Sequence, residues 1–247
     1  MKLLFRRICV ALCFASFGII CMVGNLFFIP VIILRLNKFK IIENFARDLV
    51  FVAWRVFLYL IVFYGYAKID FRAKFVRKDS AIIIIANHPS LLDVVLLLSH
   101  IRRANCIVKA SLAKNIFLFG AIKSANYILN TENEKMLELS KKALQNGENL
   151  IIFPEGTRTK DKIYMQKGAF YIAINCAKEL IALGIKMSPK SLKKGQSWYD
   201  TPQNKIKYEV DILENLDLSK FEKSRSNPIR VRLLHEKMQN LYERQDL

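Results

Sequence analysis

The sequence predicts an α/β fold, a mixed β-sheet flanked by helices, with an N-terminal membrane-embedded helical anchor. Two apolar, β-branched runs each end in a polar loop and precede a further apolar segment, which is the strand, loop and helix order of an α/β protein. The chain has 247 residues and is 53% hydrophobic, so it is long enough for one main core. With 9 Gly, 6 Pro and no repeat, a disordered, collagen-like or solenoid chain is excluded.

The anchor begins with an uncharged run of 27 residues, from Ile8 to Leu34. As one helix it would reach about 40 Å, against a hydrocarbon core of about 30 Å, so it belongs in lipid. A secretory signal peptide would have an apolar region of only about 7–15 residues followed by a small-residue cleavage site. The run is longer and has no such site, so we expect it to remain in the protein.

Basic residues flank this run on both sides, whereas a single span should carry its positive charge mainly at the cytoplasmic end. Gly24, Asn25 and Pro30 also interrupt the helical pattern. We therefore expect a re-entrant hairpin, with both ends on the cytosolic face, in preference to a tilted span. The flanking residues are Lys2, Arg6, Arg7, Arg35, Lys38 and Lys40.

A second apolar run, Val56 to Ala67, has 12 residues and is too short to span a bilayer. It suits a helix in the membrane interface, and a core helix of the following domain is the alternative. The composition changes to polar alternation at Lys68. We therefore assign residues 1–67 to the anchor and 68–247 to the domain that follows it.

The formal charge of +18 indicates anionic partners, such as phosphates or acidic lipid headgroups. Basic residues are not interleaved with aromatic ones near the motifs, which argues against nucleic acid. The five cysteines form no C-x-x-C pair, so neither a disulfide framework nor a metal site is expected. The chain is predicted to be reduced and to face the cytosol.

The first chemical motif lies in the segment from Ala81 to Leu98, which is predicted to be a strand, a tight loop and a helix headed by Pro89. If His88 lies in the loop and Asp93 in the first helical turn, the two can meet. A carboxylate on one imidazole nitrogen orients the ring and leaves the other nitrogen as a base. The alternative is that Asp93 is only a favourable charge at a helix N-terminus.

The second motif follows another buried strand, in the segment from Asn149 to Lys160. Its loop contains Glu155, Gly156, Thr157 and Arg158. The guanidinium of Arg158 suits a phosphate, and a glycine lets backbone N–H groups approach an anion. Because sites of α/β proteins lie at strand ends, this loop and the His88 loop are expected to form one site.

Together these residues resemble the glycerophospholipid acyltransferases of the H-x-x-x-x-D type, typified by 1-acyl-glycerol-3-phosphate acyltransferases. The resemblance covers about Ala81 to Met187. NHPSLLD matches the first block of the family and FPEGTR the third, and the segment with Lys109 and Phe119-Gly120 looks like the second. The fourth block departs from the pattern, because Ile185 to Ser188 and Pro189 replace the usual V-P-V strand.

The resemblance implies that His88 is the base and Asp93 its partner, and that Lys109 and Arg158 contact phosphate. It also implies that Asn87, Glu155, Gly156 and Thr157 bind substrate. No metal or cofactor is expected. The implied partners are membrane lipids, a lysophospholipid acceptor, and acyl-CoA or acyl-carrier protein as donor.

The remaining segments are typical of an α/β domain. Helices are expected at Glu132–Asn146, Lys167–Leu180 and Pro228–Tyr242, and a strand at Ile206–Leu213.

The predicted function is acyl transfer to a lysolipid hydroxyl, most simply giving phosphatidic acid at the cytoplasmic membrane. No serine or cysteine lies in a nucleophile motif, so direct attack is favoured over an acyl-enzyme. The altered fourth block leaves a different, non-phosphate lipid acceptor open, and Ser191–Lys205 resembles a subgroup linked to aryl-polyene-type pathways. The same motifs would also suit a thioester or lipid hydrolase, and the charge by itself would suit a non-enzymatic basic protein anchored to the membrane.

Overall fold

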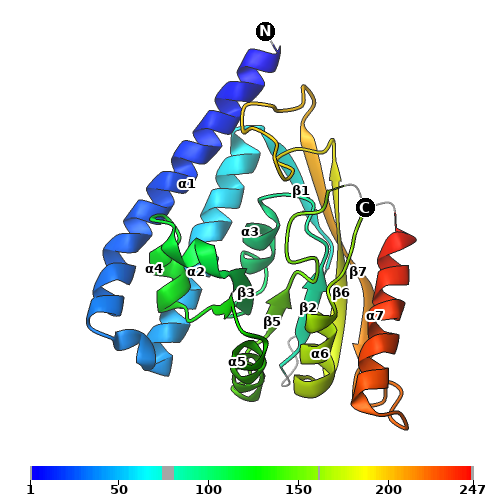
Figure 1. Cartoon of the computed structure of the whole chain (residues 1–247). Coiled ribbons are helices and arrows are strands. Elements are labelled where there is room, and N and C mark those ends of the chain that lie inside the picture. Colours follow the sequence, from blue (N-terminus) through cyan, green and yellow to red (C-terminus); the bar gives the residue numbers. More distant parts are fainter. Residues whose placement is uncertain (1, 74–80, 161, 246–247) are drawn as a thin grey trace.

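The computed structural model describes residues 2–73, 81–160 and 162–245. Within them, seven strands form one sheet in the order β1-β7-β6-β2-β5-β3-β4 (Figure 1). Strands β2 to β6 are parallel to one another, and β7 runs antiparallel to β6. The predicted mixed sheet is confirmed. Its strands are β1 (Ala67–Phe71), β2 (Ile83–Ala86), β3 (Asn105–Lys109), β4 (Ile128–Asn130), β5 (Leu150–Ile152), β6 (Glu179–Ser188) and β7 (Ile206–Asp217).

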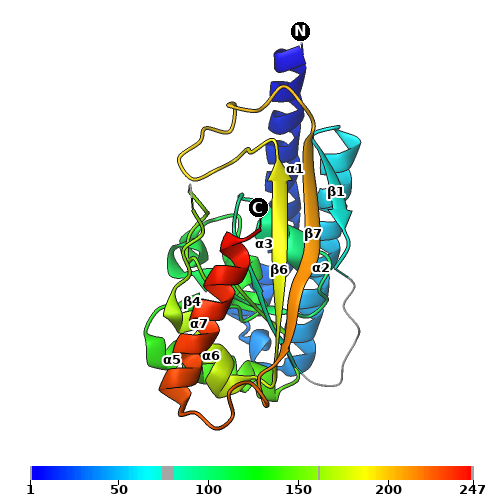
Figure 2. The same cartoon turned by 90° about the vertical axis from the view of Figure 1, so that its right-hand side faces the viewer.

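Helices cover both faces of the sheet (Figures 1 and 2). Along β2, Ile84 and Ala86 point into a core shared with α1 to α4, while Ile83 and Ile85 point into a second core shared with α5 to α7. This alternation follows from the two-residue period of a strand. The helices are α1 (Lys2–Ile33), α2 (Lys40–Phe63), α3 (Asp93–Leu98), α4 (Phe119–Ser124), α5 (Asn133–Gln145), α6 (Lys167–Cys176) and α7 (Asn227–Glu243), with 3₁₀ turns η1 (Leu36–Lys38) and η2 (Ala110–Lys114).

Helix α1 runs without a break from Lys2 to Ile33, so the expected interruption at Gly24, Asn25 and Pro30 is wrong. The reason is tertiary packing against α4. The side chain of Asn25 donates to the Ile116 carbonyl at 2.8 Å, and a Cβ on Gly120 would lie 2.1 Å from Asn25 Oδ1. Asn25 therefore attaches α1 to the segment that leads into α4, and Gly120 permits the close approach.

The chain reverses direction after α1, not within it, and returns as α2. The expected short helix at Val56–Ala67 is wrong as a separate element, because α2 already begins at Lys40 and Ala67 opens β1. One face of the α1–α2 hairpin is buried against the sheet domain, whereas Leu26 and Ile41 on its outer face are 78% and 81% exposed. Of the described helices, only α1 is long and apolar enough to cross a membrane. The division at residue 68 and the sidedness of the two ends stay predictions.

The other expected elements are present with shifted ends. The helix starting at Lys167 ends at Cys176, not Leu180, because Glu179 already begins β6. Strand β7 continues past Leu213 to Asp217. The helix of the His88 motif begins at Asp93, four residues later than Pro89. Helices α5 and α7 lie within a residue of their predicted ends.

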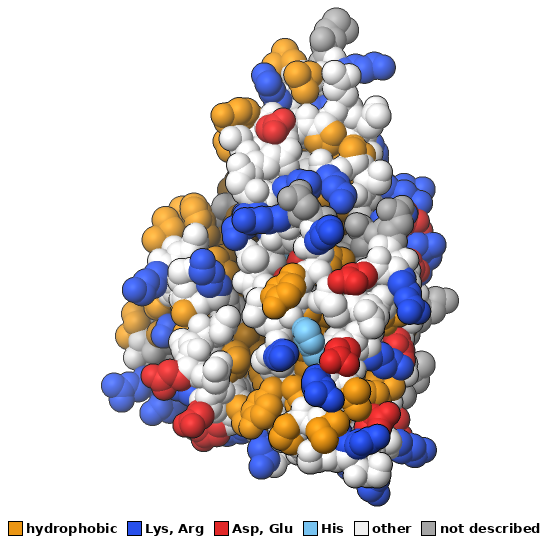
Figure 3. Space-filling model, turned by 45° about the vertical axis from the view of Figure 1, so that its right-hand side comes forward, with side chains coloured by type: hydrophobic (Ala, Val, Ile, Leu, Met, Phe, Trp, Pro, Cys, Tyr) orange, Lys and Arg blue, Asp and Glu red, His pale blue; other side chains and the backbone are white. Residues whose placement is uncertain are grey.

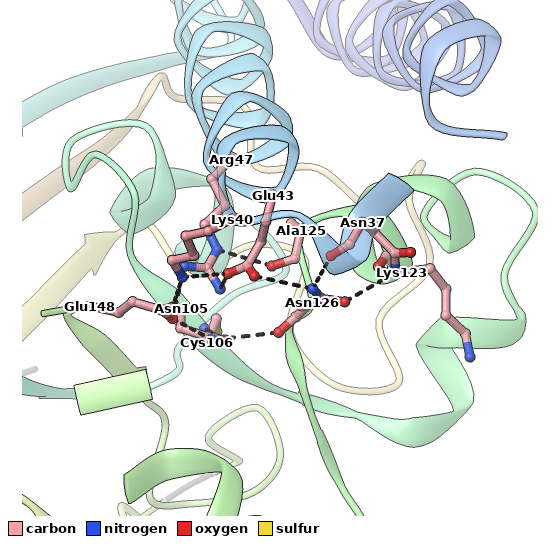
Figure 4. Close-up of polar contacts among 10 residues, drawn as sticks. All are labelled: Asn37, Lys40, Glu43, Arg47, Asn105, Cys106, Lys123, Ala125, Asn126 and Glu148. Carbon is pink, nitrogen blue, oxygen red and sulfur yellow. Dashed lines mark hydrogen bonds and ion pairs between the residues drawn. The ribbon is translucent and has the colours of Figure 1, made fainter. Parts of the chain in front are cut away.

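A buried polar cluster joins the hairpin to the sheet (Figure 4). The guanidinium of Arg47 on α2 lies 2.6 Å from Glu43 and 2.8 Å from Glu148, and its Nε donates to the Ala125 carbonyl at 3.0 Å. Lys40 pairs with the same two carboxylates. Because Glu148 follows α5 and Arg47 belongs to α2, the cluster fixes the position of α2 relative to the sheet.

Candidate active site

The two sequence motifs meet because β2 and β5 are parallel neighbours, with Ile85 opposite Ile152. Both strands therefore end at the same edge of the sheet. The loop after β2 contains His88, and the loop after β5 contains Glu155 to Arg158. A backbone hydrogen bond from Thr159 N to His88 O, of 2.7 Å, joins the two loops directly.

His88 and Asp93 form an oriented pair. His88 Nδ1 lies 2.8 Å from Asp93 Oδ2, and the Asp93 side chain is fully buried while that of His88 is 17% exposed. Because a carboxylate only accepts, the neutral ring carries its proton on Nδ1 and leaves Nε2 as the basic nitrogen. The pair can therefore take a proton from a hydroxyl or from water.

Ser90 holds the Asp93 carboxylate from the other side. Its backbone N–H donates to Oδ2 and its hydroxyl to Oδ1, both at 2.7 Å. The Ser90 oxygen itself accepts from Leu92 N–H at 3.1 Å and from the Tyr208 hydroxyl at 3.1 Å. Because the Ser90 oxygen accepts these two hydrogen bonds, the Ser90 hydroxyl donates its own proton to Asp93. Burial raises the pKa of Tyr208 well above its usual value, so this phenol remains a donor.

Glu155 is buried and connects the two loops. Its Oε1 accepts from the His88 backbone N–H and from the Thr159 hydroxyl, each at 2.8 Å. Burial raises the pKa of this carboxyl, and these two hydrogen bonds oppose the rise. The Glu155 contacts fix the backbone that carries the base.

Asn87 and Phe153 also set the position of His88. The Asn87 amide donates to the Ile185 carbonyl at 2.8 Å and accepts from the Ile185 N–H at 2.7 Å, which ties the loop to β6. The Phe153 ring lies against the imidazole, with the ring centroids 4.6 Å apart. Both ends of the Asn87 amide are thus bound by the neighbouring strand.

The predicted anion-binding residues lie in the loop after β5. Gly156 has a φ of 66°, a left-handed conformation that favours glycine, and both Gly156 and Thr157 are exposed. Arg158 is half-buried, and its Nη1 donates to the carbonyls of Leu192 at 2.8 Å and Lys193 at 3.1 Å. Arg158 therefore contacts the loop between β6 and β7.

Lys109 is exposed at the end of β3, which pairs with β5. The strand order places it at the same edge of the sheet as the two loops, one strand beyond β5. The sheet thus brings all eight residues of the predicted site to one edge, although the side chains of Asn87 and Glu155 make protein contacts there.

Sequence reasoning missed Ser90, Thr159, Phe153 and Tyr208. The first three lie inside the two motifs. Ser90 lies three residues before Asp93, and a serine at that spacing could have been predicted to donate a hydrogen bond to the Asp93 side chain. Tyr208 comes from β7 and is 118 positions from Ser90 in the chain. No local pattern could have connected these two residues.

Part of the chain matches a known protein family. Residues 68–193 match the model of the Acyltransferase family, which is more than half of the chain, so the protein belongs to that family. The loops after β2 and β5, which carry the candidate site, both lie within the matched region.

Among solved structures, the chain is similar to the 1-acyl-sn-glycerophosphate (LPA) acyltransferase PlsC from Thermotoga maritima. The TM-score is 0.65 at 23% sequence identity, and the match covers 98% of this chain and all of the other. The likeness therefore includes the N-terminal hairpin as well as the sheet, and at this identity it establishes the fold. No curated protein matches the sequence.

Proposed function

We propose that this acyltransferase moves a fatty acyl group from a thioester, acyl-CoA or acyl-carrier protein, to the hydroxyl of 1-acyl-glycerol-3-phosphate, giving phosphatidic acid. The observation that carries the proposal is the His88–Asp93 pair, with its 2.8 Å contact and the full burial of the carboxylate. The membership of the Acyltransferase family supports the same chemistry.

In the proposed reaction, His88 Nε2 accepts the proton of the acceptor hydroxyl while that oxygen attacks the thioester carbonyl. Asp93 stabilises the imidazolium that forms. The tetrahedral intermediate then collapses, the carbon–sulfur bond breaks, and the imidazolium proton goes to the thiolate. The products are an ester and a free thiol, and no acyl-enzyme forms.

We assign Arg158 and Lys109 to the acceptor phosphate, with Gly156 and Thr157 beside them. Arg158 uses Nη1 for its two bonds to the loop, so within the described chain its Nε and Nη2 are not bound to protein. A guanidinium presenting two donors suits a phosphate monoester. We assign Asn87 and Glu155 to positioning of the His88 loop, because their side-chain contacts are with protein.

We further propose that the α1–α2 hairpin lies in the cytoplasmic membrane and that the active site faces the cytosol. The long apolar helix and the exposed outer face of the hairpin support this placement. An acceptor with one acyl chain would then reach the site from the membrane, and a soluble thioester from the cytosol.

The test is a product analysis by mass spectrometry, with purified protein, both thioester donors and a panel of lysolipids. We expect acylated 1-acyl-glycerol-3-phosphate as the main product. Release of free fatty acid without acylated lipid would instead identify the protein as a hydrolase. Acylation of a neutral lipid alone would contradict the proposed phosphate-bearing acceptor.

His88→Ala and Asp93→Asn should each lower turnover by about 10²–10⁴-fold, the usual contribution of a general base. An amide at position 93 cannot stabilise the imidazolium and selects the wrong tautomer. Both variants should remain folded and bound to membranes, and normal turnover in both would contradict the assigned base.

A further inference from the structure

The loop between β6 and β7, residues 189–205, lies at the same edge of the sheet as the active site. It leaves β6 at its carboxyl end, and β6 is parallel to β2. In both cartoon views the loop passes beside the N-terminal end of α1 (Figures 1 and 2). The β6–β7 loop therefore connects the site to the exposed hairpin.

Two arginines bond to this loop, one near each of its ends. Arg158 of the active-site loop donates to the carbonyls of Leu192 and Lys193. Arg6 of α1 is buried, and its Nε donates to the Pro202 carbonyl at 3.2 Å while its other nitrogens bond to the carbonyls of Gly65 and Tyr66. Both ends of the loop are thus fixed.

The middle of the loop is exposed and aromatic. Trp198 and Tyr199 are 47% and 51% exposed, and the Trp198 ring meets Phe14 of α1 edge-on, with centroids 6.2 Å apart. Phe14 is itself 39% exposed on α1. The aromatic pair therefore continues the apolar surface of the hairpin.

The same loop contains basic residues. Lys190 and Lys194 are exposed, and Lys193 is half-buried in the same loop. In the space-filling view, Lys and Arg side chains are spread over the face shown, its upper part included (Figure 3). Trp and Tyr prefer the headgroup layer of a bilayer, and lysines close to an anionic leaflet are attracted to it.

From this arrangement we propose that the β6–β7 loop is a second membrane-docking element, whose Trp198 and Tyr199 enter the headgroup layer while its lysines bind anionic lipid headgroups. The inference rests on the proposed placement of the hairpin in the membrane. Because Arg158 bonds to the same loop, docking of the loop also sets the position of Arg158 relative to the membrane surface.

Tryptophan fluorescence tests the proposal, because the chain has only two tryptophans and Trp54 is buried. The Trp54→Phe protein reports Trp198 alone and is reconstituted in phosphatidylcholine vesicles with and without phosphatidylglycerol. We expect a blue shift of the emission, quenching by a headgroup spin-labelled lipid, and lower access of iodide than in protein without vesicles. The quenching should be stronger with phosphatidylglycerol.

The matched controls are Trp198→Phe, in which Trp54 should stay inaccessible to iodide, and the double variant Lys193→Glu, Lys194→Glu, which should remove the effect of phosphatidylglycerol. A protein that floats with the vesicles but leaves Trp198 open to iodide and unquenched would overturn the docking loop and leave the hairpin proposal standing. Failure to float would overturn both.

Discussion

At the scale of single residues, Arg158 bonds to the β6–β7 loop and is proposed to bind the acceptor phosphate as well. We expect Arg158→Ala to raise the KM for a phosphate-bearing acceptor by about 10- to 100-fold, the loss of a charge-assisted hydrogen bond. Arg158→Lys should restore only part of this, because the bidentate geometry is lost. The measurement is steady-state kinetics with each substrate varied in turn.

The exposed neighbour Lys160 provides a control, and Lys160→Ala should change the acceptor KM little. If Arg158→Ala instead impaired use of the thioester and left acceptor kinetics unchanged, Arg158 would serve the phosphates of the donor. The assignment of Arg158 to an acceptor phosphate would then be wrong.

The raised pKa of Glu155 predicts how the stability of the protein changes with pH. Burial raises the pKa of its carboxyl, so the folded protein holds this proton more tightly than the unfolded chain does. The contribution of Glu155 to stability is therefore present below its unfolded pKa and is lost as the pH rises through its folded pKa. Glu155→Gln keeps an acceptor for the His88 N–H and has no charge to desolvate.

We expect the stability of the parent protein to fall relative to that of Glu155→Gln as the pH rises from about 4 towards neutrality, around the ordinary pKa of a glutamate. Thermal unfolding of both proteins across this range measures the difference. A gap that is constant with pH, or that widens in acid, would contradict the assignment.

At the scale of elements, the buried cluster around Arg47 decides how α2 attaches to the sheet. Burial raises the pKa of Glu148, but Arg47 and the hydrogen bonds from Lys40 and Asn105 outweigh this, so the pKa lies below its ordinary value. Stability from Glu148 is therefore present above its unfolded pKa and is lost as the pH falls through its folded pKa. The pH dependence of stability from Glu148 therefore has the opposite sign to that from Glu155.

Glu148→Gln leaves the Arg47 charge buried with one carboxylate fewer, and the cost should reach up to about 3–5 kcal/mol at neutral pH. The matched control is Asp217→Asn, which removes the exposed pair with Lys220 and should cost less than about 1 kcal/mol. Chemical unfolding at pH 7 compares the two. Equal losses of unfolding free energy in the two variants would show that burial of the cluster does not increase its contribution to stability.

At the scale of the whole molecule, the hairpin and the sheet share one core, so the hairpin and the candidate site belong to a single unit. We expect the protein to stay in the membrane fraction after washing with high salt. The apolar surface of the hairpin is insensitive to salt, whereas headgroup attraction is screened within about 3 Å at 1 M salt. Release of the protein by salt alone, followed on blots of washed membranes, would refute insertion.

The sequence alone determined the two strand-and-loop motifs, the spacing of His88 and Asp93, and the long apolar N-terminal run, because each depends on local spacing and periodicity. It did not determine that α1 is continuous. Gly24, Asn25 and Pro30 weaken a helix in isolation, but packing against α4 around Gly120 overrides that local preference.

Only the tertiary structure decided which groups hold the residues of the candidate site. Tyr208 reaches Ser90 from another strand, Arg158 turns to the carbonyls of the β6–β7 loop, and Glu155 joins two loops that are 67 positions apart in the chain. The physical reason is that hydrogen bonds between distant segments depend on strand order and register, and these are set by burial of the whole sheet. A local pattern specifies which residues can do the chemistry, and the assembled core specifies how they are held.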